Sequence, residues 1–314
     1  MMDRFKNLRE GLQSKGFRAD STAMFEKSLT ATLSRIQETV FSEAISQMVF
    51  PMAPVLGPGL TAIEYYRGVP TGEMQLIGPN SSDLPRMDES MERTERPVAN
   101  YGGTFGWSLI EFERAQRQNY NFGERRAMHS RKISERKLDS IVFGESDPDK
   151  SDILGLFGYS LSPASGLTGG WNAATDQQIL DDVQRVLEAG YTGSGGEIEP
   201  DTVLLGSQEY GILKYRMRTQ TDSSLLEIVE SKFNVTVHRS ARLDSVTSAT
   251  NSLSAAPVMV SYKNDSTIAE LQMPRPFEMR PGEWRGNQYC VDCYLDFAGL
   301  FLYLPPSFGL GDLS

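Results

Sequence analysis

The stretch SLIEFERAQRQNYNFGERRAMHSRKISERKLDSIVFG, residues 108–144, is the longest helix-like segment of the chain. Ser108 is followed three residues later by Glu111, which is the spacing of a capping box that satisfies backbone N–H groups at a helix start. Gly123 argues for a break, because glycine inside a helix costs about 1 kcal/mol relative to alanine. The stretch therefore predicts a short helix, a kink, and a long helix that ends near Val142.

The long helix is rich in charge and poor in large apolar side chains. Residues 111–139 contain eight Arg or Lys and five Asp or Glu. A helix with so few core anchors is typical of an element that lies along a surface, whereas a bundle helix carries a broad apolar stripe. An ordinary solvated amphipathic helix is the plainer alternative.

Composition limits the classes of function. The chain has 314 residues, a net charge of −10 and a pI of about 4.9. These values argue against a broad basic face for nucleic acid, although a local basic stripe is compatible with them. Two cysteines cannot form a disulfide framework and fit a reducing compartment. We see no signal peptide and no apolar run of about 20 residues, and therefore expect a soluble intracellular product that does not enter a membrane.

The segments before the helix are predicted to be an arm and a hairpin. Residues 1–60 form a helical arm that ends in a Pro/Gly-rich linker. Residues 61–106 form an extended β-hairpin, with a short strand at 74–77 and a polar connecting loop at 78–97. The mixed charges of that loop suit pairing with a neighbouring chain, although simple solvation is the commoner role. The candidate contact residues are Asp83, Arg86, Asp88, Glu92, Arg93 and Arg96.

The remaining segments predict an α+β fold. Residues 107–154 contain the long helix, and residues 155–265 alternate helices with strands as one mixed domain. The best-defined helix there, at 171–190, has Thr175 as its N-cap and Gly190 as its stop signal. Residues 266–314 are almost entirely strand-like and are expected to return to pair with the earlier strands around the long helix.

Sites of chemistry are not evident. Phosphate-binding loops, dinucleotide-binding turns and nucleophile elbows are all missing from the sequence. The two histidines, His129 and His238, are read as structural or solvated. Cys290 and Cys293 fall on opposite faces of a predicted strand, and a structural zinc needs four ligands, so both are read as packing residues. The expectation is a protein that is not an enzyme and has no catalytic residue, cofactor or metal.

Several motifs, taken in order, resemble the major capsid proteins of tailed bacteriophages, whose fold is shared with encapsulin shells and herpesvirus capsid floors. The resemblance covers about residues 50–308. The matching segments are IGPNSSDLPRMD (77–88), PVANYGGTFGWSLIEFERAQ (97–116), KLDSIVFGE (137–145), WNAATDQQILDDV (171–183) and FEMRPGEWRGNQYCVDCYLDFAGLFLYLPPSF (277–308).

The resemblance implies an N-terminal arm (1–60), an extended loop (61–106), a peripheral domain with the spine helix (107–154), an axial domain (155–265) and a β return to the peripheral domain (266–314). It implies a structural subunit that assembles in the host cytoplasm into pentamers and hexamers of an icosahedral head. The shell would enclose genomic DNA without sequence-specific binding, with scaffolding, portal and decoration proteins as candidate partners. The alternatives are an encapsulin-like nanocompartment shell and a carboxylate-based hydrolase.

Overall fold

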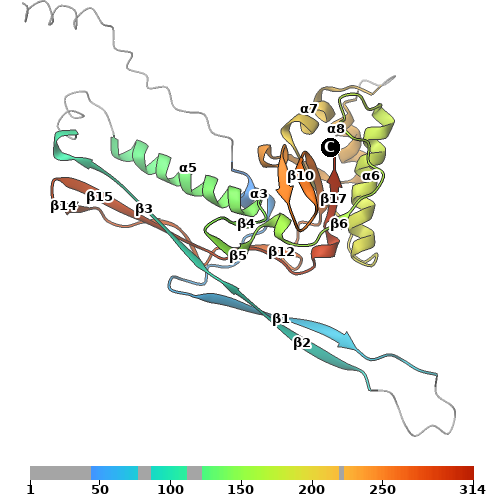
Figure 1. The fold of residues 1–314 in the computed structure, drawn as a ribbon, viewed down its shortest axis with the longest axis horizontal. Coiled ribbons are helices and arrows are strands. Elements are labelled where there is room, and N and C mark those ends of the chain that lie inside the picture. Colours follow the sequence, from blue (N-terminus) through green and yellow to red (C-terminus); the bar gives the residue numbers. More distant parts are fainter. Residues whose placement is uncertain (1–43, 77–85, 112–121, 219–222) are drawn as a thin grey trace, which may run out of the picture. The chain divides into compact units, whose positions relative to one another are not determined.

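The computed structural model describes residues 44–76, 86–111, 122–218 and 223–314. The chain divides into two units, residues 1–42 and 43–314, and every described residue belongs to the second. Figure 1 shows its helices and strands. The predicted arm at 1–60 therefore lies largely outside the described residues.

A five-stranded sheet forms the centre of one half of the unit. Its strand order is β6 (Ser162–Pro163), β17 (Gly309–Asp312), β11 (Val258–Tyr262), β7 (Thr202–Leu205) and β8 (Thr236–Arg239). β11 runs antiparallel to both of its neighbours, whereas the outer pairs β7–β8 and β17–β6 are parallel. The sheet is thus mixed.

Both faces of this sheet are buried, as the sequence of β11 shows. Val258, Val260 and Tyr262 belong to one apolar cluster, whereas Met259 belongs to another. Alternation along a strand places these sets on opposite faces. The helices α6 (Asp176–Gly193), α7 (Ser207–Tyr215) and α8 (Leu225–Phe233) contribute to the cluster that contains Met259.

Helix α6 begins where the sequence predicts and ends later. The Thr175 side chain accepts from the backbone of Gln178, whose side chain accepts from Thr175, and this confirms the capping box. The predicted stop at Gly190 is wrong, because α6 continues to Gly193. A Cβ added at Gly190 would lie 2.9 Å from the carbonyl oxygen of Ser307. The glycine therefore permits close helix–backbone packing.

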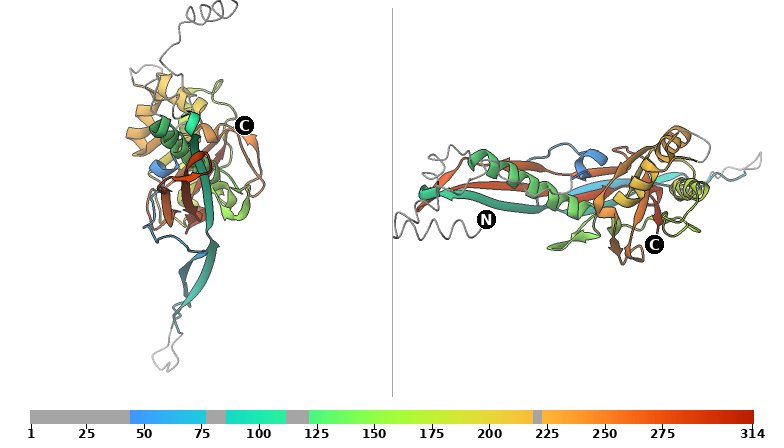
Figure 2. Two further views of the ribbon diagram at one scale, coloured as in Figure 1. Left: turned by 90° about the vertical axis from the view of Figure 1, so that its left-hand side faces the viewer. Right: turned by 90° about the horizontal axis from the view of Figure 1, so that it is seen from above.

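A second sheet carries the long helix. Its strands are β13 (Arg275–Met279), β14 (Glu283–Arg285), β15 (Gln288–Phe297) and β3 (Ala99–Ser108). β15 pairs with each of the other three, and its antiparallel ladder with β3 runs for ten residues. Helix α5 (Phe122–Val142) lies beside β3 (Figure 2) and ends at the predicted residue.

The start of the helical stretch is also as predicted. The backbone N–H of Ser108 donates to Glu111 at 3.1 Å, and that of Glu111 donates to the Ser108 hydroxyl at 3.2 Å. This is the reciprocal pair of a capping box. The break was expected at Gly123, which the structure places inside α5. Residues 112–121, just before α5, lie outside the described residues.

The remaining helices and strands complete the unit. They are α3 (Ser46–Val49), β1 (Ala62–Thr71), β2 (Asp88–Pro97), β4 (Ser146–Asp147), β5 (Lys150–Leu154), η1 (Leu156–Gly158), η2 (Ala241–Leu243), β9 (Val246–Ser248), β10 (Leu253–Ala256), β12 (Ala269–Gln272), β16 (Gly299–Leu302) and η3 (Pro305–Ser307). β1 pairs with β2, β4 with β5, β9 with β10, and β12 with β16.

Three expected segments differ in the structure. The segment predicted as a loop, 78–97, contains strand β2. The sequence did not reveal this strand, because a ribbon exposed on both faces lacks the alternation of apolar and polar residues that marks a strand. Residues 74–76 have no regular structure. The hairpin pairing ends at Pro97, since β3 pairs with β15.

Residues 266–314 were expected to return to the earlier strands around the long helix. Strand β15 does so by pairing with β3, whereas β17 does not. β17 pairs with β11 and β6 in the five-stranded sheet. The C-terminal segment has apolar residues that are buried on both faces of the five-stranded sheet. Leu310 packs into one apolar cluster and Leu313 into the other.

Helix α5 is anchored at its C-terminal end. Leu138, Ile141 and Val142 are buried there. Asp139, also buried, accepts hydrogen bonds from the backbone N–H groups of Ile45 and Ser46, both at 3.0 Å. Burial raises the pKa of Asp139 and outweighs the opposite effect of these two donors. The carboxylate thereby caps α3 from another helix, satisfying donors that a short helix leaves unpaired.

A cluster of charged groups joins α5 to the β4–β5 hairpin. Lys137 Nζ lies 2.9 Å from Asp147 and 2.8 Å from Asp149, and the Tyr101 hydroxyl donates to Asp147. Burial alone would raise the pKa of Asp147, but the hydrogen bonds from Tyr101 and Lys137 outweigh it and hold the pKa below its usual value. Burial, together with the hydrogen bond to Asp147 and the negative charges of Asp147 and Asp149, raises the pKa of Tyr101.

Two glycine substitutions should have opposite effects on stability. Gly190→Ala places a methyl group against the backbone of residues 307–309 and should lower the free energy of unfolding by about 1–3 kcal/mol. Gly211→Ala, in α7 with open space at its Cβ position, should raise it by up to about 1 kcal/mol. Thermal unfolding of the two full-length variants measures both effects. Equal stability of the two would contradict the packing described for α6.

The Asp147 cluster predicts a loss of stability in acid. A lowered folded pKa means that the contribution is present above the unfolded aspartate pKa, about 3.9, and is lost as the pH falls through the folded value. Asp147→Asn should cost about 1.5–3 kcal/mol at pH 7 and flatten the pH dependence below about pH 4. Melting curves from pH 3 to pH 7 test this, with the exposed Asp152→Asn as the matched control. An unchanged pH profile in Asp147→Asn would contradict it.

Candidate functional site

The hairpin of β1 and β2 is the candidate site, because the predicted contact residues lie on it. Its two ten-residue strands pair antiparallel, from Ala62 opposite Pro97 to Thr71 opposite Asp88. Within the part of the chain that the structure describes, the two strands pair with each other and with no further strand. An isolated two-stranded hairpin is marginally stable in water, so the ribbon needs support from elsewhere.

Among the described residues, those that pack against the hairpin do so at its base. Tyr65 packs its ring 5.6 Å from Phe301 and 5.1 Å from Tyr303, measured between centroids. A small apolar cluster built on Val98, Ala298 and Phe301 receives these side chains. Aromatic pairs at such distances contribute about 0.5–1.5 kcal/mol beyond their area burial. The base is therefore fixed to β16 and to the residue that follows it.

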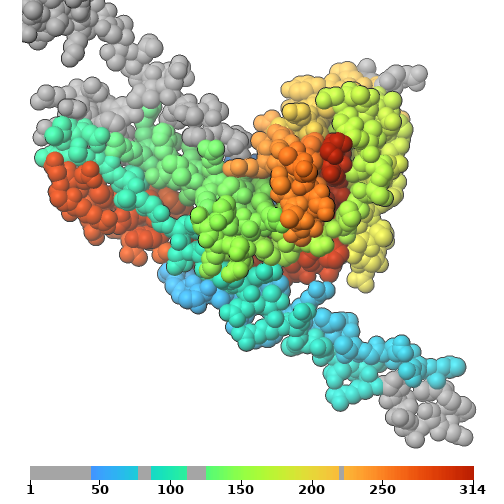
Figure 3. Space-filling view, viewed as in Figure 1, coloured from blue at the N-terminus to red at the C-terminus, as the bar shows by residue number. Residues whose placement is uncertain are grey.

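Beyond the base, large apolar side chains are open to solvent. The exposed ones are Tyr66, Val69, Met74, Leu76, Met87 and Met91. Figure 3 shows the ribbon open along much of its visible face. Exposed apolar groups gathered on one element mark an interaction surface, whereas scattered ones need no explanation.

Tyr66 and Met91 share one face of the ribbon. In the register, Tyr66 lies opposite Arg93 and Met91 lies opposite Gly68. Because Tyr66 and Gly68 are two residues apart, Tyr66 and Met91 are diagonal neighbours on the same face. Tyr66 and Met91 are 62% and 70% exposed, so this face of the ribbon presents a large apolar surface to solvent.

Three of the predicted charged residues, Arg86, Asp88 and Arg93, form exposed ion pairs on the hairpin. Arg86 and Asp88 form an ion pair of 3.0 Å at the open end of the ribbon, and both side chains are exposed. Arg93 pairs across the strands with Glu64 and also lies 3.6 Å from Glu95. Such exposed pairs contribute about 0–1 kcal/mol each to stability.

Of the remaining predicted residues, Glu92 is exposed in β2 and Asp83 lies outside the described residues. Arg96 is placed differently, because its guanidinium lies over the Tyr159 ring at 5.7 Å. Its Nε is buried, without a hydrogen-bond partner among the described residues. Arg96 therefore serves the hairpin base and is not displayed to a neighbour by this structure.

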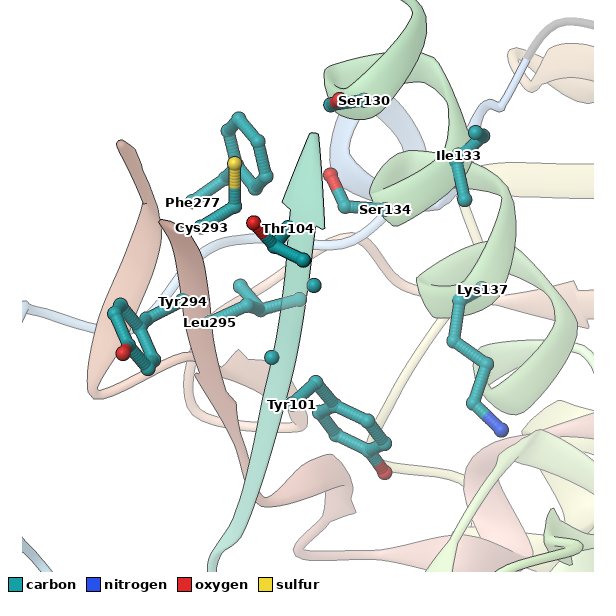
Figure 4. Close-up of a pocket in the computed structure, with 12 residues that line it drawn as sticks. Tyr101, Thr104, Ser130, Ile133, Ser134, Lys137, Phe277, Cys293, Tyr294 and Leu295 are labelled. Carbon is teal, nitrogen blue, oxygen red and sulfur yellow. The ribbon is translucent and has the colours of Figure 1, made fainter. Parts of the chain in front are cut away.

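A pocket of about 300 Å³ lies between α5 and the second sheet. In Figure 4, Tyr101 and Thr104 of β3 face Ile133, Ser134 and Lys137 of α5 across it. Phe277 of β13 and Cys293, Tyr294 and Leu295 of β15 make up most of the rest of its lining. The helix therefore does not press evenly on the sheet, which agrees with its anchorage at one end.

The two cysteines occupy β15 as the sequence predicts. Both are free; Cys293 is buried and Cys290 is half-buried. Burial, with a smaller effect of Asp292, raises the pKa of the Cys293 thiol. Within the described residues, no group of three or more His, Cys, Asp or Glu side chains is arranged to hold a metal ion.

Among the helices that the structure describes, none is long and apolar enough to cross a membrane.

Sequence reasoning missed the exposed apolar residues of the hairpin as a set. A usable signal was the pattern of isolated apolar residues among charges on both arms of the hairpin. Buried Asp139 gave no signal, because its partners are backbone groups more than 90 positions away.

Comparisons with known proteins identify the family. The sequence model of the major capsid protein family matches residues 72–313. A search of curated proteins finds no match. The family match covers both sheets, α5 and strand β2 of the hairpin, and it begins at the residue after β1.

Solved structures with a similar fold include several capsids. The capsid of Myoviridae phage XM1 has a TM-score of 0.79 at 18% identity, covering 91% of this chain and 97% of that chain. The capsid of a native GTA particle has a TM-score of 0.63 at 9% identity, with coverages of 91% and 95%. A virus-like particle from Pyrococcus furiosus has a TM-score of 0.50 at 11% identity, with coverages of 85% and 92%.

These similarities confirm the predicted α+β fold class. The chain belongs to the major capsid protein family and is a structural subunit of a capsid shell of the tailed-phage type.

Proposed function

We propose that this subunit assembles into pentamers and hexamers of a closed shell and that the β1–β2 hairpin holds neighbouring copies together. The observation that carries the proposal is the hairpin itself. Its strands are ten residues long, it is supported only at its base, and it exposes apolar side chains beyond. A ribbon of this kind gains stability when a neighbouring copy covers it.

The charged residues add specificity to that contact. Asp88 and Glu92 are exposed on β2, and Arg86 is exposed beside Asp88. With Asp83 and Arg93 they are the proposed polar rim of the interface. Individual pairs of this kind are weak, but several contacts per subunit repeated around a shell strengthen one another.

The remaining roles follow from the same proposal. The residues around α5 and the second sheet form the peripheral domain, and the five-stranded sheet with its helices forms the axial domain. The shell encloses genomic DNA without reading its sequence, and assembly takes place in the host cytoplasm. Scaffolding, portal and decoration proteins are the proposed additional partners.

Assembly is the first test. The purified protein, alone or with its scaffold, should form pentamers, hexamers, tubes or closed shells in negative-stain micrographs and light scattering. A monomer at every salt and protein concentration, with scaffold present, would contradict the proposed function.

Shortening the hairpin should separate assembly from folding. Because Arg67 lies opposite Glu92, residues 68–91 can be replaced by an Asn-Gly turn that suits a two-residue hairpin. This keeps Tyr65 and the apolar base. The variant should melt cooperatively, close to the wild-type temperature, but fail to close shells or form fragile ones.

Two point variants refine that test. Tyr66→Ser with Met91→Ser removes exposed apolar groups and should weaken shells at all salt concentrations. Arg86→Glu should give a milder defect that depends on salt, because exposed charges are screened over about 8 Å at physiological ionic strength. Normal shells from the shortened hairpin would show that the ribbon is not the contact. Its unfolding would show that the ribbon belongs to the core of the subunit.

A further inference from the structure

Two carboxylates from separate segments meet at the start of helix α7. Glu209 lies in the first turn of α7, and Asp244 follows η2. A Cβ added at Gly206 would lie 2.4 Å from Oε2 of Glu209 and 2.7 Å from Oδ1 of Asp244. Both oxygens therefore lie within 2.7 Å of one point, and a residue without a Cβ is needed to admit them there. We call Glu209 and Asp244 the α7 carboxylate pair.

Glu209 is the buried member of the pair. It is 8% exposed, and its Oε2 is buried without a hydrogen-bond partner among the described residues. A carboxylate oxygen that has left water without gaining a partner is unfavourable, and more so when the group is charged. This is the same oxygen that converges with Oδ1 of Asp244, so the atom that needs a partner faces the other carboxylate.

Asp244 is the half-buried member of the pair and is held in place by the helix. Its Oδ1 accepts a hydrogen bond from the backbone N–H of Ser207, the first residue of α7. An ionised carboxylate has about four lone-pair sites on its two oxygens, so this hydrogen bond leaves sites free to bind a metal ion. Because Asp244 is only half-buried, water reaches this side of the pair.

The charges around the pair do not balance. Among the ion pairs between described residues, none includes Glu209 or Asp244. Burial raises the pKa of Glu209, its own backbone N–H lowers it, and the charge of Asp244 raises it. The N-terminus of a helix supplies about half an elementary charge, which is too little to neutralise two carboxylates. The pair therefore carries an excess of negative charge that a cation offsets.

The donor set indicates which cation fits. Both protein ligands are carboxylates, whose oxygens calcium and magnesium prefer. Calcium accepts oxygens at about 2.3–2.6 Å in a flexible geometry, whereas magnesium demands a nearly ideal octahedron at about 2.0–2.1 Å. Two oxygens within 2.7 Å of one point suit the longer bonds of calcium. Since the described residues contain no larger group of metal-binding side chains, water provides the remaining ligands.

We propose that the α7 carboxylate pair binds one calcium ion, with water completing its coordination. The ion joins α7 to η2, whose Arg242 lies 3.7 Å from Asp139 of α5. It therefore stabilises the folded subunit itself, whether or not the subunit assembles. A site of this kind leaves no motif in the sequence, because its two ligands come from separate segments, and the sequence analysis accordingly predicted no metal.

The test uses the full-length subunit, freed of divalent ions by EDTA and dialysis. Calcium chloride is added to about 10 mM, and binding is followed by calorimetry and by thermal unfolding. A site of two carboxylates and water belongs with the weaker natural calcium sites, so we expect one ion per subunit with a Kd of about 0.1–1 mM. At the highest calcium concentration the melting temperature should rise by about 3–6 °C. Magnesium chloride should bind at least about tenfold more weakly.

Two variants each remove one charge while keeping the shape of the side chain. Glu209→Gln and Asp244→Asn should each weaken calcium binding at least about tenfold and remove the calcium-dependent rise in melting temperature. Asp244→Asn keeps an oxygen that accepts the backbone N–H of Ser207, so the start of α7 should remain folded. The matched control is Glu230→Gln, the same change at an exposed position of α8, which should respond to calcium as wild type does.

Four results would overturn the proposal. The first is the absence of any calcium-dependent change in wild type up to about 10 mM. The second is an equal rise in melting temperature in Glu209→Gln and wild type, which would place the ion elsewhere. The third is a wild-type melting temperature that ignores calcium but rises as the pH falls from about 7 to about 5, with no such rise in Glu209→Gln, because the two carboxylates would then share a proton. The fourth is magnesium binding as tight as calcium binding.

Discussion

The carboxylate of Asp139 joins elements on which the rest of the structure depends. It accepts two backbone hydrogen bonds from residues 45–46 and lies 3.7 Å from Arg242 of η2. Removing one partner of a buried charge typically costs about 3–5 kcal/mol, because the remaining groups cannot be rehydrated. Since the buried apolar residues of α5 are all close to Asp139, this one contact fixes the end of the helix to the start of the described chain and to the five-stranded half. Nearer the other end of α5, Arg126 donates to the carbonyl oxygen of Gly106 in β3 and lies 3.6 Å from Glu111.

The hairpin shows the opposite physical situation. Its ladder is complete, yet nothing in the described residues covers its outer apolar side chains. Backbone hydrogen bonds in a solvated ribbon contribute little net free energy, because water competes for the same groups. A structure that is fully paired but mostly unburied is stable only when something else buries it. If a neighbouring copy covers the hairpin, as we propose, part of the folding free energy of each subunit comes from assembly.

Local rules succeeded where the chain interacts with itself over a few residues. The capping boxes at Ser108 and Thr175 were readable because both partners lie within one turn. Strand β2 could not be predicted from the sequence. Both of its faces are solvated, so charged residues occupy positions where a strand usually alternates apolar and polar residues. Gly190 was interpreted as a helix stop. A glycine is needed there because the helix lies close to the backbone of Ser307, more than 100 residues later. Among the candidate contact residues, Arg96 lies over the ring of Tyr159, a contact within the chain that no local pattern of residues signals.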